Sequence, residues 1–351
     1  MQNPFTTTFS KPPEYTYVAT EQPNEILENF SYDHPTESVY KITGVRGSGK
    51  TVILAKVEEK LRKKGWLVFD INPTRETLQQ IAAMLSNAGY SKNKEKNSSI
   101  SVSASVMGTG GRFGYSTSQT NDPYFDVGIA IENMIQEVQK RKKKILIGID
   151  EISKTDEMVK FASEYGRWLR ADYPVYLVCT GLYENIQQLS NVKNLTFFRR
   201  ATTIQTEPLN RILMTEMYKT KLHISIDIAK EMAAITKGYA FAFQELGVLS
   251  FKQGSNFELK AIVPMLKAEL FAYSYEKIWE KLTNMDRLFV KQLTSKEEYK
   301  REEVLALMKD KAANYSVYRD RLIKRGILSS RQGYISLALP YFGEYIKEYC
   351  Q

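Results

Sequence analysis

The segment at residues 44–51, Gly-Val-Arg-Gly-Ser-Gly-Lys-Thr, restricts the fold more than any other feature, because it matches G-x-x-x-x-G-K-[ST] in full. It follows an apolar, β-branched run at Val39–Thr43 and precedes a helical pattern that stops at Gly65. A strand, a glycine-rich loop and a helix in this order direct backbone N–H groups and a helix N-terminus at phosphate oxygens. The sequence therefore predicts a phosphate-binding loop made of Gly44, Val45, Arg46, Gly47, Ser48, Gly49, Lys50 and Thr51.

Two side chains of this loop have the chemistry to act on a nucleoside triphosphate. Lys50 is expected to contact the β- and γ-phosphates, and the hydroxyl of Thr51 is expected to hold magnesium. We therefore expect ATP and Mg²⁺ to bind here, with ADP as the product ligand.

A second apolar run, at residues 145–150, ends in the carboxylates Asp150 and Glu151. Asp150 is expected to order the magnesium ion, and Glu151 is expected to act as the base that takes a proton from the attacking water. Taken alone, the pair could cap a helix, since Ser153 and Thr155 follow it. About 100 residues after a complete phosphate-binding loop, it instead favours hydrolysis of ATP to ADP and phosphate.

Two further positions have catalytic candidates with a structural alternative. Thr180 ends the apolar run after Val175, where it either contacts the γ-phosphate or the attacking water, or simply ends a strand. Arg199 and Arg200 precede the last expected strand. There are two alternatives for this pair: one of the arginines neutralises transition-state charge on a neighbouring subunit's ATP, or both pair with surface acids.

The order of elements predicts the fold class. Apolar strands at Val39–Thr43, residues 66–71, residues 145–150 and residues 175–180 alternate with helical patterns, which is typical of a parallel sheet covered on both faces. We predict an α/β P-loop domain with three layers at residues 1–207. Within it, apolar residues alternate with serines on both sides of a glycine-rich turn, which favours a β-hairpin at about 99–118 over a disordered linker.

The rest of the chain is predicted to be mainly helical. Residues 208–282 are expected to form a helical lid domain, and residues 283–351 have the outline of a winged helix, with three helices and then a two-stranded ribbon. On the expected recognition helix and wing, candidate DNA-binding residues are Arg319, Arg321, Lys324, Arg325 and Arg331. Helical spacing places three of them, Arg321, Lys324 and Arg325, on one exposed face. Winged helices also dock proteins, so duplex DNA and a protein partner both stay open.

Composition narrows the class of protein. The apolar runs are too short to cross a bilayer, so no membrane association is expected. Two cysteines in different contexts and the absence of a signal-peptide pattern fit a cytoplasmic protein. The net charge of +9 points weakly to a polyanion. Five of the cations stand at residues 140–144, where the alternative is a solvated helix end.

Taken together, these residues resemble the AAA+ and STAND group of ATPases, and more closely the bacterial and archaeal ATP-binding proteins related to origin-recognition ATPases. The resemblance runs over nearly the whole chain. It is carried by Asn3-Pro-Phe-Thr-Thr-Thr-Phe9, the loop at 44–51, Ile149-Asp-Glu-Ile152, Cys179-Thr-Gly-Leu182, Phe198-Arg-Arg-Ala201, Glu207-Pro-Leu209 and residues 238–246.

This resemblance implies an ATP-driven switch in which Thr180 is the first sensor, Arg200 is the arginine finger and the lid begins at Pro208. Action of Arg200 on a neighbouring copy implies a homo-oligomer. Separately, the one-sided apolar alternation of the 99–118 hairpin needs a cover, for which a neighbouring subunit or a partner is the simplest candidate. The lid departs from the group, because Gln244 stands near the expected second sensor arginine and Gly238-Tyr-Ala240 replaces Gly-x-Pro. Turnover is therefore expected to be slow or stimulated by a partner. The alternative is a STAND-like signalling, defence or mobile-element regulator whose last domain binds a protein.

Overall fold

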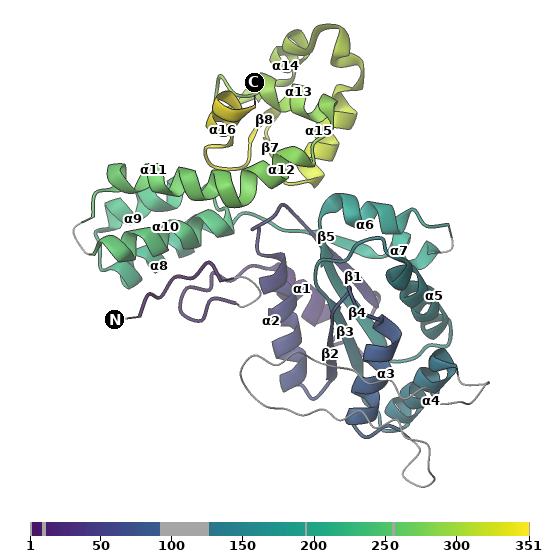
Figure 1. The fold of residues 1–351 in the computed structure, drawn as a ribbon. Coiled ribbons are helices and arrows are strands. Elements are labelled where there is room, and N and C mark those ends of the chain that lie inside the picture. Colours follow the sequence, from purple (N-terminus) through teal and green to yellow (C-terminus); the bar gives the residue numbers. More distant parts are fainter. Residues whose placement is uncertain (1, 9–11, 92–125, 194, 255–256, 351) are drawn as a thin grey trace.

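A computed structural model describes residues 2–8, 12–91, 126–193, 195–254 and 257–350 (Figure 1). The hairpin predicted at 99–118 lies outside these residues.

The first half of the chain is built around a parallel sheet. Its strands are β1 (Val39–Thr43), β2 (Leu67–Ile71), β3 (Ile145–Ile149), β4 (Val175–Gly181) and β5 (Thr202–Gln205), in the order β2-β3-β4-β1-β5. All four pairings are parallel. Every residue of β1, β3 and β4 is buried, as expected for strands that are covered on both faces.

Helices cover the two faces of this sheet. On one face, α1 (Gln22–Asn29) and α2 (Lys50–Lys63) share an apolar core with Ile42, Leu146 and Val178. The other face packs against α3 (Thr77–Asn87), α4 (Val127–Lys140), α5 (Asp156–Arg170), α6 (Tyr183–Ser190) and α7 (Thr196–Arg200). The predicted three-layer α/β fold is confirmed.

A helical unit follows the sheet and lies beside it (Figure 1). Its helices are α8 (Arg211–Leu222), α9 (Ile226–Ile235), α10 (Ala240–Gln253) and α11 (Leu259–Leu270). The last of these continues without a break through a π-helical turn, η1 (Phe271–Tyr275), into α12 (Glu276–Glu280). This continuation was not predicted, and it joins the helical unit firmly to the part of the chain that follows.

The last part of the chain contains the predicted helices and ribbon, with one additional short strand. Its elements are α13 (Asn284–Gln292), β6 (Tyr299–Lys300), α14 (Arg301–Met308), η2 (Lys309–Asn314), α15 (Tyr315–Lys324), β7 (Leu328–Arg331), β8 (Tyr334–Leu337) and α16 (Phe342–Tyr349). The three strands form an antiparallel sheet in the order β6-β8-β7. Its action as a winged helix stays a prediction, as do the bounds of the three domains.

One apolar core runs through the helical unit and through the last part of the chain, from α13 to α16, which we call the last unit. The same core reaches the phosphate-binding loop. It contains Leu246 of α10, Leu266 of α11, Leu322 of α15 and Val45 of the loop. The loop therefore lies where all three parts of the chain meet. No helix in the part of the chain described is both long and apolar enough to span a bilayer.

Candidate functional site

The loop at residues 44–51 connects β1 to α2 and has the conformation needed to surround an anion. Gly49 caps the helix with φ of 92°, a left-handed conformation that a residue with a Cβ adopts only with strain. Its carbonyl accepts from the backbone N–H of Ile53 at 3.1 Å, in the first turn of α2. The positive end of that helix consequently points into the loop.

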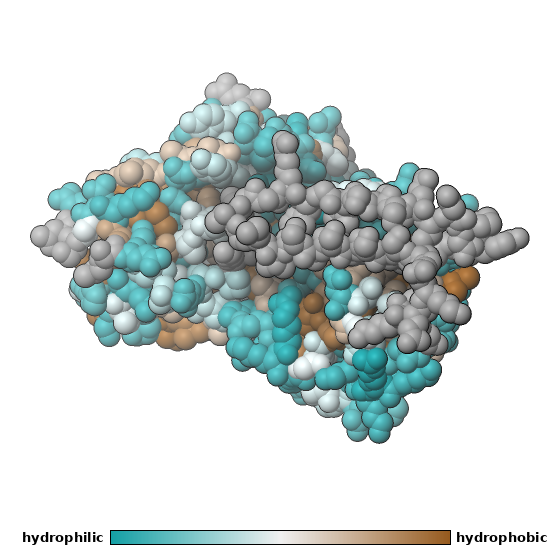
Figure 2. Space-filling view, turned by 60° about the horizontal axis from the view of Figure 1, so that its bottom comes forward, coloured by the Kyte–Doolittle hydropathy of each residue, from teal (hydrophilic) through white to brown (hydrophobic). Residues whose placement is uncertain are grey.

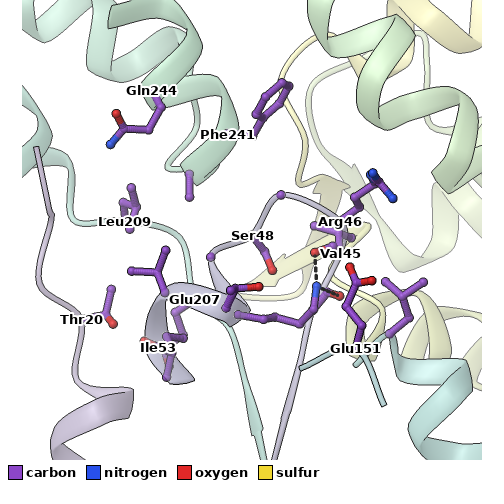
Figure 3. Close-up of a pocket in the computed structure, with 18 of the residues that line it drawn as sticks. Thr20, Val45, Arg46, Ser48, Ile53, Glu151, Glu207, Leu209, Phe241 and Gln244 are labelled. Carbon is purple, nitrogen blue, oxygen red and sulfur yellow. Dashed lines mark hydrogen bonds between the residues drawn. The ribbon is translucent and has the colours of Figure 1, made fainter. Parts of the chain in front are cut away.

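Lys50 lies inside the loop and is almost completely buried. Its Nζ donates to the carbonyl oxygens of Val45 at 2.8 Å and Gly44 at 3.2 Å (Figure 3). Burial lowers the pKa of this amine to about 8, although the nearby carboxylates Asp150 and Glu151 favour the charged form. A phosphate anion next to Nζ would raise that pKa again, so the site is suited to a strongly negative ligand.

Asp150 lies at the carboxyl end of β3 and connects two hydroxyl groups. Thr51 Oγ1 donates to Asp150 Oδ2 at 2.9 Å, and Thr180 Oγ1 donates to Asp150 Oδ1. The pairing of β3 with β4 places Asp150 next to Thr180. The Thr51 hydroxyl and the Asp150 carboxylate are hard oxygen donors and fit Mg²⁺, which takes one or two protein oxygens together with phosphates and water. No group of three or more His, Cys, Asp or Glu within the described ranges could hold a metal by itself.

Glu151 follows Asp150, is exposed, and lines the same pocket. Its backbone is left-handed, with φ of 54°, which is uncommon for a residue other than glycine. Thr180 stabilises this conformation by accepting from the Glu151 backbone N–H at 3.1 Å. The buried threonine therefore holds the Asp150 carboxylate and the Glu151 backbone, which sequence alone did not show.

The pocket beside the loop has a volume of about 540 Å³ and is lined by residues from every part of the chain. The N-terminal segment contributes Tyr17 and Val18, and the phosphate-binding loop forms the floor. In Figure 3, Phe241 and Gln244 lie on one side of the loop and Glu151 on the other. The lining also includes Lys277 and Lys281 from the α12 region, and Arg325 and Ile327 from the last unit. No sequence pattern in that unit predicted this contribution.

The helical unit contacts the loop directly through its residues 239–241. Tyr239 donates its hydroxyl to the carbonyl of Arg46 at 2.6 Å, and the N–H of Phe241 donates to the carbonyl of Gly47 at 3.0 Å. Both contacts use carbonyl groups of the loop as acceptors and none of its N–H groups. The position of the helical unit is therefore coupled to the conformation of the loop.

Gln244 connects the helical unit to the N-terminal segment. Its Oε1 accepts from the Thr6 N–H at 3.1 Å and from Thr16 Oγ1 at 3.0 Å, and its Nε2 donates to the Thr16 carbonyl at 3.2 Å. The residue near the expected second sensor position thus lines the pocket, and its amide accepts two hydrogen bonds and donates one within the protein.

The expected exposed basic face of α15 is wrong for Arg325, and Arg321 is only partly exposed because it is paired. Arg325 is 6% exposed, donates to Asp286 Oδ2 at 3.0 Å and to the Lys281 carbonyl at 2.7 Å, and forms an ion pair with Glu184. Arg321 Nε donates to Asp286 Oδ1 at 3.0 Å. The reason is Asp286, a completely buried carboxylate on α13 that needs cations around it. It lies 35 to 39 positions earlier in the sequence, so helical spacing could not reveal it.

The other candidate DNA-binding residues are more accessible. Lys324 and Arg331 are exposed, and Arg319 is half-buried. Arg319 donates to Asp320 and to Ser330 Oγ, each at 2.8 Å, and so connects α15 to β7.

Arg199 and Arg200 are exposed at the end of α7, and neither lines the pocket of its own chain. Arg199 Nε donates to the Ser190 carbonyl at 3.4 Å. A role for Arg200 in this chain's own site is not supported by the geometry, which leaves the predicted action on a neighbouring subunit.

Comparison with solved structures establishes the fold of the chain. The Walker-type ATPase PABY2304 of Pyrococcus abyssi superimposes with a TM-score of 0.61 over 93% of this chain and 95% of that one, at 11% identity. Cdc6p from Pyrobaculum aerophilum gives 0.47, with 98% of both chains covered at 16% identity. The Aeropyrum pernix ORC1 protein, solved in complex with DNA, gives 0.46 over 96% and 95% of the two chains at 14% identity. The first of these superpositions shows that the chain has the fold of a Walker-type ATPase.

Sequence comparisons cover less of the molecule. Residues 272–346 match a family model described as a domain of unknown function (DUF8462). No curated protein matches the sequence.

Proposed function

We propose that this chain, which has the Walker-type ATPase fold, binds ATP with Mg²⁺ and hydrolyses it slowly to ADP and phosphate as a molecular switch. The observation that carries the proposal is the network that joins Thr51 and Thr180 through Asp150 and orients Glu151 at the same pocket. This network joins the magnesium-binding groups of the loop to a candidate base at the neighbouring strand end.

In the proposed reaction each residue has a defined task. Lys50 and the loop N–H groups bind the β- and γ-phosphates, and Thr51 with Asp150 holds Mg²⁺, which neutralises charge on those oxygens. Glu151 accepts a proton from the water that attacks the γ-phosphorus. Thr180 donates its hydroxyl to Asp150 and accepts from the backbone N–H of Glu151, so it holds Asp150 and the Glu151 backbone in place. ATP and water are consumed, and ADP and phosphate are formed.

Two variants test this assignment. Lys50→Ala should weaken ATP binding at least about tenfold, because the buried cation of the loop is lost. Glu151→Gln should keep ATP affinity within about threefold and lower turnover by about 100-fold, since the magnesium-binding groups stay intact while the base is lost. Fluorescent-nucleotide titration and phosphate release measure the two effects. Wild-type turnover in Glu151→Gln would show that another residue is the base.

The finer part of the proposal is that the last unit engages duplex DNA through Lys324 and Arg331, which are exposed on α15 and at the end of β7. Replacing both by Ala should weaken duplex binding and lower its salt dependence by about one unit of slope per phosphate contact. Unchanged binding would transfer the role to the alternative, a signalling or defence regulator that docks a protein. That alternative is supported by the engagement of Arg321 and Arg325 with Asp286.

Two further features complete the proposal. Arg200 would act on the ATP of a neighbouring copy, so Arg200→Ala should lower turnover only at concentrations where the protein assembles, without changing nucleotide affinity. A wild-type monomer whose specific activity is independent of concentration would exclude this role.

Cys179 and Cys350, both free and buried, fit the proposed cytoplasmic location.

A further inference from the structure

Two basic segments that are far apart in the sequence lie side by side at the end of the sheet opposite the nucleotide pocket. The first segment ends α2 and the second ends α4, and each leads into one of the neighbouring strands β2 and β3. The N–H of Leu67 donates to the Lys144 carbonyl at 3.0 Å, and Lys143 Nζ donates to the Gly65 carbonyl at 3.3 Å. We call their cations the basic face: Lys60, Arg62, Lys63, Lys64, Lys140, Arg141, Lys142, Lys143 and Lys144.

Helix ends explain only part of this charge. Lys60, Arg62 and Lys63 stand in the last turn of α2, and Lys140 stands in the last turn of α4, where cations stabilise the helix dipole. The other five members lie beyond the helix ends. Stabilisation of the two helix dipoles therefore does not account for all nine cations.

Acidic side chains compensate only some of the cations. Glu59 pairs with Lys63 at 2.6 Å and with Lys56 at 2.9 Å, and Glu137 pairs with Lys140 at 2.8 Å. Arg62 donates to Glu58 Oε2 at 3.3 Å, but burial raises the pKa of that carboxyl to about 7, so Glu58 compensates Arg62 only in part near neutral pH. Among the described residues no acid pairs with Lys60, Lys64 or Lys142, and all three are exposed. The basic face thus keeps an excess of solvent-accessible positive charge.

Other members are held in position by aromatic rings and carbonyl groups. Lys144 Nζ lies over the rings of Trp66 and Tyr176, at 5.3 and 5.6 Å from their centroids. The guanidinium of Arg141 stacks on Tyr90 at 4.6 Å and donates to the Gly89 carbonyl at 3.4 Å. These contacts reduce the entropy that the long side chains would lose on binding a ligand.

The same contacts distinguish the kinds of polyanion. Because Lys144 and Arg141 cover the aromatic rings, those rings are not available as platforms for unpaired bases. The exposed large apolar side chains within the described ranges include none at residues 60–67 or 138–145, which disfavours insertion into a lipid surface. In Figure 2, which turns this end of the molecule forward, most of the described surface in view is hydrophilic.

We infer that the basic face binds the phosphate backbone of duplex DNA through charge, without reading its sequence. Each phosphate that meets a lysine releases bound counterions, so affinity should fall steeply with salt. This surface lies at the amino ends of β2 and β3, whereas Asp150 and Glu151 follow the carboxyl end of β3. A duplex can therefore be held without blocking the nucleotide pocket.

Charge reversal at the uncompensated lysines tests the inference. The probe is a fluorescein-labelled random duplex of ~20 base pairs, followed by anisotropy between about 50 and 200 mM salt. Lys64→Glu with Lys142→Glu should weaken binding at least about tenfold at the lowest salt and lower the salt slope by about 0.9 per lost contact. The matched control, Lys252→Glu with Lys260→Glu, makes the same charge change on exposed residues of the helical unit and should stay within about threefold of wild type.

Further measurements distinguish binding by the basic face from binding by other parts of the molecule. Circular dichroism and nucleotide binding should be unchanged in Lys64→Glu with Lys142→Glu, and the neutral pair Lys64→Gln with Lys142→Gln replaces it if folding fails. Duplex affinity equal to that of the control would overturn the inference. A loss confined to Lys324→Glu with Arg331→Glu would also overturn it, while supporting DNA engagement by the last unit. Binding to phosphatidylserine vesicles but not to the duplex would assign the basic face to membranes instead.

Discussion

Glu58 is a buried carboxyl group close to the proposed nucleotide site, on the helix that begins at Lys50. It is 7% exposed, and Gly148 of β3 makes room for it, since a Cβ there would lie 2.0 Å from Glu58 Oε1. Burial raises the pKa of Glu58 to about 7, with further contributions from the charges of Asp70 and Asp150 and an opposing one from Arg62. The group consequently keeps its proton near neutral pH in the folded state.

This pKa predicts how stability depends on pH. Between about 4.5 and 7, the folded chain retains a proton that the unfolded chain has lost, so the contribution to stability is fully present below pH 4.5 and lost by about pH 7. Glu58→Gln should remove that dependence and raise the free energy of unfolding at pH 8 by roughly 1–3 kcal/mol, since partial solvent contact weakens the full effect. Denaturant unfolding at pH 5, 6, 7 and 8 measures it.

The neighbouring Glu59 supplies the control for this prediction. It is paired with Lys56 and Lys63, whose hydrogen bonds lower the pKa of Glu59 to about 2. Glu59→Gln should therefore leave the fall in stability between pH 5 and 7 unchanged. An identical pH profile in wild type and Glu58→Gln would show that Glu58 is ionised in the folded protein.

At the scale of elements, the strands and helices around residues 44–51 and 145–150 could be predicted from sequence, because a chemical motif and the pattern of neighbouring residues indicate the same elements. The loop at residues 44–51 and the strand that ends at Asp150 have local signatures, and parallel pairing brings Asp150 to Thr180. The partners of α15 are set by the tertiary fold. Its basic residues appear exposed in a helical projection, because nothing local to residues 315–325 reveals the buried Asp286 on α13.

The cluster around Asp286 predicts that arginines of one helix differ in their structural importance. Arg325→Ala should destabilise the last unit by about 3 kcal/mol, because it leaves a buried carboxylate with less compensation. Arg321→Ala should have a smaller effect, since Arg321 is partly exposed. The exposed Lys324 provides the control on the same helix, and Lys324→Ala should be within about 0.5 kcal/mol of wild type. Equal free energies of unfolding for Arg325→Ala and Lys324→Ala would contradict this account.

At the scale of the whole molecule, the last unit is docked against the phosphate-binding loop. Gln205 Nε2 donates to the Ile323 carbonyl at 2.6 Å, and a Cβ on Gly326 would lie 3.4 Å from a methyl carbon of Val45. Arg325 pairs with Glu184 of α6 as well as with Asp286. Sequence patterns could not predict this docking, because it joins residues more than 100 positions apart that carry no shared motif.

The Arg325–Glu184 pair allows the docking to be weakened from one side. Glu184→Gln removes the charge on α6 but leaves Arg325 paired with Asp286, so the last unit should stay folded. Because Arg325, Glu184 and the loop line one pocket, a weaker contact should open that wall and speed the release of bound nucleotide by about threefold to tenfold, corresponding to a coupling of roughly 1 kcal/mol. Stopped-flow release of a fluorescent ADP measures this rate, and small-angle scattering measures the accompanying expansion.

Glu157→Gln, which removes the exposed ion pair with Lys160 on α5, should change neither quantity. Equal release rates in Glu184→Gln and wild type would mean that the docked unit does not restrict the nucleotide, and that the switch operates through the helical unit and its contacts with Arg46 and Gly47.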